Sequence, residues 1–186
     1  VKVVNVLLAR KEIQINRANN IGCTPLYIAC QNDRVKVVNI LLARKEIQIN
    51  QAANDGATPL CIACCKGRVK VINALLARKE IQINQAMNEG ATPLFIACQK
   101  DLVKVVKALL ARKEIQINQA TNNGATPLSI ACQKDRVKVV KALLARKEIQ
   151  INQANSNGAT PLYMACQQGH VKVVNVLLAR KEIQIN

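Results

Sequence analysis

The ten residues LLARKEIQIN occur six times without a change, beginning at Leu7, Leu41, Leu75, Leu109, Leu143 and Leu177, always 34 residues apart. A fixed period of this length is typical of solenoids, in which each unit buries its apolar face against its neighbours. No linker interrupts the repeat. We therefore expect one domain covering residues 1–186, with a partial unit at 1–16 and full units at about 17–50, 51–84, 85–118, 119–152 and 153–186.

Each unit carries the signals for two helices. In residues 51–84, Thr58 is placed to cap a helix that begins at Pro59, because a proline at the first helical position loses no hydrogen bond. The spacing predicts that this helix buries Leu60, Ala63 and Cys64.

The second helix follows a turn at Gly67, and its predicted buried face consists of Val69, Ile72 and Leu76. Residues 81–83 then alternate as a short extended arm that leads to a hairpin tip. Asp33, Asp101 and Asp135 replace the turn glycine in other units, where Asp tolerates a left-handed conformation and can cap the next helix.

The motif at the first helix start is TPLYIA at 24–29 and TPLCIA at 58–63, followed by TPLFIA, TPLSIA and TPLYMA in the same slot. Through these motifs the chain resembles the ankyrin-repeat family over all 186 residues. The resemblance implies an all-α solenoid of stacked helix-turn-helix units with short hairpin loops. It also implies a non-enzymatic scaffold for protein–protein interaction.

Three features depart from the family pattern: the 34-residue period, the absence of His after Thr-Pro-Leu, and the segment KEIQIN in place of a glycine-containing loop. We place the extra residue near Lys79 and Glu80. We expect backbone groups or side chains of the Asn84 type to replace the bonds of the missing His.

The slot that the family fills with His holds the three aromatic residues and two small ones: Tyr27, Cys61, Phe95, Ser129 and Tyr163. Four residues later on the same helical face come Gln31, Cys65, Gln99, Gln133 and Gln167. The resemblance implies that a partner protein binds this concave inner-helix face and the hairpin tips. We therefore add the tip residues Asp55, Glu89, Asn123 and Asn157, and the first-helix ends Lys66, Lys100 and Lys134.

We expect the aromatic side chains to be partly exposed and to contact the partner. The alternative is that they only pack between adjacent units.

The cysteines do not form a convincing metal site. Cys61, Cys64 and Cys65 lie on one helix, but a zinc site needs four ligands and the one histidine, His170, is three units away. The recurrent Cys30, Cys64, Cys98, Cys132 and Cys166 should be about 8–10 Å apart, beyond disulfide reach. We expect reduced thiols, an intracellular, cytoplasmic location, no cofactor, and no catalytic residues.

The net charge of +16 comes mostly from the invariant segments. It predicts basic ladders such as Lys36, Lys70, Lys104 and Lys138, and Arg44, Arg78, Arg112 and Arg146. We favour a solvated face, with polyanion binding as the alternative. Nucleic acid is the less favoured partner, because the charges lack the interleaved aromatics that single-stranded nucleic acid sites usually offer. A structural spacer within a longer array is a further alternative.

No apolar stretch has the length of a membrane span, and the N-terminal residues are a copy of the repeat. Because the chain begins and ends within interior units, we also expect end-to-end self-association through Val3, Val4 and Leu7 at one end and residues 173–178 at the other.

Overall fold

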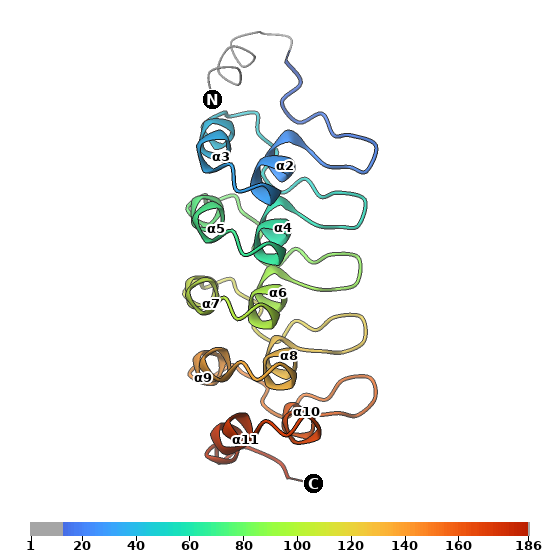
Figure 1. The fold of residues 1–186 in the computed structure, drawn as a ribbon, viewed down its shortest axis with the longest axis vertical. Helices are drawn as coiled ribbons and strands as arrows, with labels where there is room; N and C mark the ends of the chain where they lie inside the picture. The colour runs from blue at the N-terminus through green and yellow to red at the C-terminus, as the bar shows by residue number, and fades with distance from the viewer. Residues whose placement is uncertain (1–12, 186) are drawn as a thin grey trace. The chain divides into compact units, whose positions relative to one another are not determined.

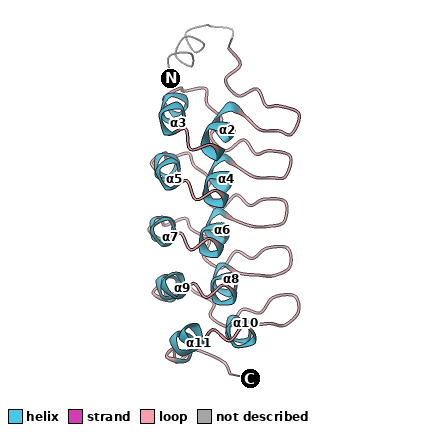
Figure 2. Ribbon diagram, viewed as in Figure 1, coloured by secondary structure: helices cyan, strands magenta, loops and turns pink. Residues whose placement is uncertain are grey.

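The computed structural model describes residues 13–185, which form helices joined by turns and loops, with no strand in that range (Figure 2). The contacts divide the chain into two compact units, Val1–Asn88 and Glu89–Asn186. No described helix has the length and apolar character of a transmembrane span.

The first unit contains α2 (Pro25–Gln31), α3 (Val35–Leu42), α4 (Pro59–Cys65) and α5 (Val69–Leu76). Within each repeat the two helices pack together, and α2 packs on α4 while α3 packs on α5 (Figure 1). We call α2 and α4 inner helices, because the hairpin loops precede them, and α3 and α5 outer helices.

The second unit repeats this arrangement three times. Its inner helices are α6 (Pro93–Gln99), α8 (Pro127–Gln133) and α10 (Pro161–Gln167), and its outer helices are α7 (Val103–Leu110), α9 (Val137–Leu144) and α11 (Val171–Leu178). Helix α8 packs between α6 and α10, and α9 packs between α7 and α11 (Figure 1). The all-α ankyrin architecture predicted from the motifs is confirmed.

The inner helices begin where the Thr-Pro motif predicts. The Oγ1 atom of Thr58 accepts a hydrogen bond from the backbone N–H of Cys61 at 3.1 Å, and Pro59 is the first helical residue. Thr126 makes the same bond in α8, where Ser129 reciprocates by accepting from the N–H of Thr126. These bonds satisfy donors that a helix N-terminus leaves unpaired.

The outer helices bury a slightly different face from the predicted one. In α5 the fully buried residues are Val71, Ile72 and Leu75, whereas Val69 and Leu76 are only half-buried. The prediction was correct for Ile72, but Leu75 is buried in place of Leu76, and Val71 in place of Val69, because the helix turns Val71 and Leu75 toward the neighbouring helices.

The turn aspartates have φ angles of 55–56°, which confirms their predicted left-handed conformation. The capping role was wrong. The outer helices begin after Arg34, Arg68, Leu102, Arg136 and His170, and none of these helices has a side-chain cap.

The KEIQIN segment forms consecutive turns and not an extended arm, although Ile81 and Ile83 are buried and Gln82 is exposed as the alternation predicts. Its final Asn connects adjacent repeats. Asn50 donates from Nδ2 to the carbonyl of Glu80 at 2.8 Å and accepts from the N–H of Gln82 at 2.9 Å. The same pair of bonds is made by Asn16, Asn118 and Asn152. Side chains of the Asn84 type thus do bond between repeats, and their role as a replacement for the missing His stays a prediction.

The arginines of this segment also connect repeats. Arg78 donates to the carbonyl of Leu42, at the end of the preceding outer helix, at 2.7 Å, and pairs with Glu80 at 2.7 Å. Arg146 and Arg180 likewise bond to the carbonyls of Leu110 and Leu144. These guanidinium groups are structural, since each satisfies a carbonyl that a helix C-terminus leaves unpaired.

The expected end-to-end contact rests in part on Val3, Val4 and Leu7, which lie outside the described residues. At the other end, Val173 and Leu177 are buried within the second unit, and Leu178 is exposed. Self-association stays a prediction.

Candidate functional site

The hairpin tips are held together by a backbone ladder within each unit. The N–H groups of Asn54, Asn88, Asn122 and Ser156 donate to the carbonyls of Ile21, Asp55, Glu89 and Asn123, at 3.0–3.1 Å. Gly56 has a φ of 80°, and an added Cβ there would lie 2.6 Å from the nitrogen of Asn88, so the close approach requires glycine. The tip side chains Asp55, Glu89, Asn123 and Asn157 are exposed, as a contact role requires.

The inner-helix ends are held by the following repeat. Arg68 donates from Nε to the carbonyl of Gln31, Arg136 donates to that of Gln99, and Nε2–H of His170 donates to that of Gln133 at 3.0 Å. These bonds hold the backbone at Gln31, Gln99 and Gln133, which belong to the predicted contact face. Gln31, Cys65, Gln99 and Gln133 are half-buried, Gln167 is exposed, and the neighbouring Lys66, Lys100 and Lys134 are exposed.

The predicted exposure of the aromatic side chains is wrong for Tyr27 and Phe95 and correct for Tyr163, and the two small residues of the slot are buried as well. Tyr27 is 5% exposed, Cys61 0%, Phe95 8% and Ser129 3%, whereas Tyr163 is 56% exposed. The buried members are covered by other parts of their units.

The surroundings of Tyr27 show how this slot is covered. Burial, and then the negative charge of Asp55 in the next repeat, raise the pKa of Tyr27 to about 12. The phenol is hydrogen-bonded to Cys23, and the thiols of Cys61 and Cys65 also lie close enough to raise its pKa. Tyr27 is thus a packing residue that stays neutral across the physiological pH range.

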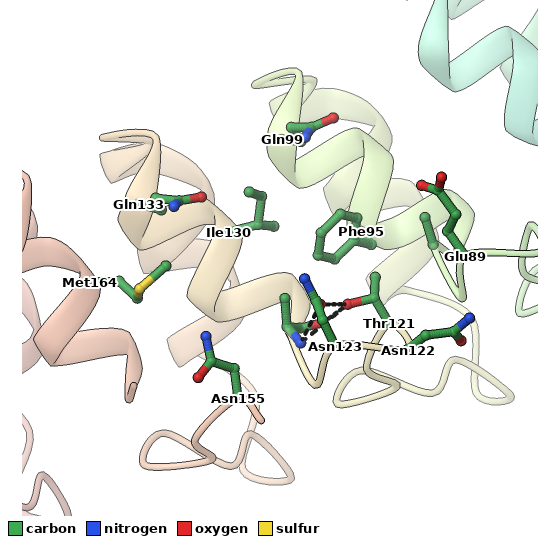
Figure 3. Close-up of a pocket in the computed structure, with 12 residues that line it drawn as sticks. Glu89, Phe95, Gln99, Thr121, Asn122, Asn123, Ile130, Gln133, Asn155 and Met164 are labelled. Atoms are coloured by element: carbon green, nitrogen blue, oxygen red, sulfur yellow. Dashed lines mark hydrogen bonds between the residues drawn. The ribbon is translucent and has the colours of Figure 1, made fainter. Parts of the chain in front are cut away.

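In the second unit several predicted site residues line one pocket, with a volume of about 480 Å³ (Figure 3). Phe95 and Ile130 provide its apolar surface, with Met164 at one side. The amide side chains Gln99, Gln133, Asn122, Asn123 and Asn155 surround it, together with Glu89 and Thr121. The pocket brings together the predicted residues Glu89, Phe95, Gln99, Asn123 and Gln133.

Asn123 is held in place at this pocket. Its Oδ1 atom accepts from the hydroxyl of Thr121 at 2.6 Å and from the N–H of Ala125 at 3.2 Å (Figure 3). Because Oδ1 is occupied, the Nδ2 group is the part of the side chain that suits a partner carbonyl.

A second pocket, of about 370 Å³, contains Asn157, Tyr163 and Gln167 together with Asn155 and Met164. These two pockets contain pocket-lining residues that the sequence analysis missed: Ile130, Met164, Thr121 and Asn155. Ile130 lies inside the TPLSIA motif, to which the sequence analysis gave no contact role at this position, and it is buried while still lining the pocket. The other repeats have Ile at the position of Met164, and this change was the signal that the sequence offered.

All eight cysteines are free thiols in the structure. Burial raises the pKa of Cys30 and of Cys132 to about 12 and raises that of Cys98 further. Such thiols are protonated at neutral pH, whereas nucleophilic and metal-binding cysteines are thiolates. Within residues 13–185, no three His, Cys, Asp or Glu side chains are grouped so that they could hold a metal ion.

The family model for ankyrin repeats (three copies) matches residues 1–53, 48–121 and 114–186. No curated protein matches the chain. Ankyrin repeats are generally protein–protein interaction modules, and proteins built from them are generally non-enzymatic scaffolds. With the motif, the paired helices and the family match in agreement along the sequence, the chain belongs to the ankyrin-repeat family.

Proposed function

We propose that the chain is a non-enzymatic scaffold that binds another protein through the inner helices and hairpin tips. The observation that carries this proposal is the pocket of the second unit, which combines an apolar surface at Phe95 and Ile130 with surrounding amides. An apolar pocket with a few converging polar groups is typical of a binding site.

The pocket chemistry favours an extended segment of a partner. An uncharged apolar side chain of that segment would occupy the space above Phe95 and Ile130. The amides of Gln99 and Gln133 would then pair with peptide groups on either side, since each offers both donors and an acceptor, and Nδ2 of Asn123 would donate to a peptide carbonyl. Specificity would come from the apolar side chain and from charge near Glu89.

A catalytic role has no support from the side chains that could act as a nucleophile or base. The hydroxyl of Ser129 is buried and donates to the carbonyl of Thr126 as part of the helix cap. The ring of His170 is bonded to the carbonyl of Gln133. We also infer an intracellular location, because eight free thiols suit a reducing compartment.

Site-specific photo-crosslinking tests the proposal. A benzophenone amino acid replaces Gln99 or Gln133 in one set of proteins, and Asn73, which is exposed on α5, in the control. We expect the inner-helix positions to cross-link a defined protein from cell extract, and the Asn73 position to yield none of it. The spacer interpretation predicts no specific product at any position, and a product common to all three positions would also contradict the proposal.

A further inference from the structure

The outer helices of the second unit carry a group of lysines on their exposed face. Lys104 and Lys107 lie on α7, and Lys138 and Lys141 lie on α9. All four are exposed, because the opposite faces of both helices are buried. We call these four residues the lysine cluster.

The cluster concentrates positive charge on a small surface. Helices α7 and α9 pack against each other, which places their axes roughly 8–10 Å apart. Lysines three residues apart on one helix have Cβ atoms about 5–6 Å apart. Neither helix contains an acidic residue, and the exposed Lys113 and Lys147 follow shortly after the helix ends.

Internal pairing does not neutralise the cluster. In the described part of the second unit every ion pair joins an Arg to a Glu two residues later, as in Arg112–Glu114 and Arg146–Glu148. The same pairing removes the Arg ladder from consideration as an anion site. The lysines of the cluster take part in none of these pairs.

The fold does not require the cluster. The slot of Lys107 and Lys141 holds Asn39, Asn73 and Asn175 in the other outer helices. The scaffold therefore accepts Asn at this position, and the first unit has the same helices with half of the charge.

The chemistry of the face favours phosphate. Lys ammonium groups bind phosphate as compact point charges, without the bidentate geometry that the Arg fork gives to carboxylate and phosphate alike, so a face of lysines suits a dense row of phosphates. Large hydrophobic side chains that are exposed in the described residues lie outside α7 and α9, so this face offers nothing to insert into a bilayer. It also lacks the aromatic rings on which single-stranded bases stack.

We propose that the lysine cluster binds the phosphate backbone of double-stranded nucleic acid, independently of base sequence and separately from the inner-helix site. A rigid duplex presents a dense row of phosphates and needs neither apolar nor aromatic contacts. A scaffold with this second surface would hold its protein partner next to a duplex.

Fluorescence anisotropy with a DNA duplex of about 20 base pairs tests this inference, at several salt concentrations between about 50 and 300 mM. The test variant is Lys107→Asn/Lys141→Asn, which copies the residue of the other repeats. The control, Lys45→Asn/Lys79→Asn, removes the same charge from exposed positions of the first unit. Each lost phosphate contact lowers the slope of log K against log salt by about 0.9, so we expect the test variant to lose about two units of slope.

We also expect the test variant to bind at least about tenfold more weakly at the lowest salt, and the control to change the slope by less than about half a unit. The reverse change, Asn39→Lys/Asn73→Lys, should increase the slope. Equal losses in the test and control variants would show that net charge alone drives binding, and would overturn the inference. Failure of the wild type to bind the duplex, with or without binding to phosphatidylserine vesicles, would also overturn it.

Discussion

Tyr27, Phe95 and Tyr163 occupy one repeat slot in two different environments. The first two are buried and the third is exposed, although the local motif is the same. The motif fixes the helix and the direction of the side chain, but burial also depends on the neighbouring repeats. A single-sequence pattern gives the period and does not give the tilt between repeats, which is why the exposure of this slot could not be predicted.

The aromatic slot yields a prediction about stability. Phe95→Ala should lower the free energy of unfolding by about 3 kcal/mol, because it removes a large buried side chain and leaves a cavity. Tyr163→Ala serves as the matched control and should change it by less than about 0.5 kcal/mol. Urea denaturation followed by circular dichroism measures both values, and similar losses would contradict the burial of Phe95.

The Asn side chains that end each KEIQIN segment and join adjacent repeats yield a second prediction at this scale. Asn50→Ala should cost about 1 kcal/mol of stability, because two hydrogen bonds between adjacent repeats are lost. Asn73→Ala should leave stability unchanged or slightly higher, since Asn73 is exposed within a helix, where Ala is the better helix former. Loss of stability in both variants would show that the two hydrogen bonds of Asn50 contribute nothing specific.

At the scale of the helices and loops, the Thr-Pro starts were predictable because they depend on two adjacent residues. The roles of Arg78 and Glu80 could not be predicted. The sequence shows an invariant Arg-Lys-Glu in every copy, which we attributed to a solvated face. The bond from Arg78 to the carbonyl of Leu42 depends on where the preceding helix ends in space. The signal in the sequence was an invariant Arg, whose guanidinium is a forked donor, two residues before an invariant Glu.

The Arg–Glu pairs predict how stability depends on pH. Hydrogen bonds to the carboxylates lower the pKa values of these glutamates below the usual 4.5. The bond from the backbone has the largest effect, followed by the bond from Arg, for Glu46, Glu80 and Glu114. The bond from Arg has the largest effect for Glu148 and Glu182. A lowered folded-state pKa means that the contribution is present above the unfolded value and is lost as the pH falls through the folded value. Stability should therefore decrease as the pH is lowered past 4.5.

Urea midpoints measured between about pH 7 and pH 3 check this expectation. Replacing all five glutamates by Gln should make the decrease shallower. The control Glu89→Gln removes a hairpin-tip carboxylate that belongs to none of these Arg–Glu pairs, so it should not reproduce that change. A profile that is identical in the five-residue variant would mean that the pairs do not couple to folding.

At the scale of the whole molecule, the family and the general interaction role could be predicted from the repeat alone. The pocket residues could be predicted only in part. Gln99, Gln133 and Asn123, which we predicted to contact a partner, do line the pocket, because helical spacing and tip position place them there. Ile130 and Met164 were missed, because a motif residue that is both core and pocket surface looks like core in the sequence.

The central claim is that the inner-helix side binds a partner protein. Its most direct test uses the partner that cross-linking identifies. Isothermal titration calorimetry measures the binding of that partner to the wild type, to Gln99→Ala/Gln133→Ala, and to the outer-helix control Asn73→Ala/Asn175→Ala. The account predicts that the Gln variant weakens binding by about 1 kcal/mol or more, roughly a fivefold increase in Kd, while the control binds like the wild type. An unchanged affinity in a correctly folded Gln variant, or an equal loss in the control, would contradict the account.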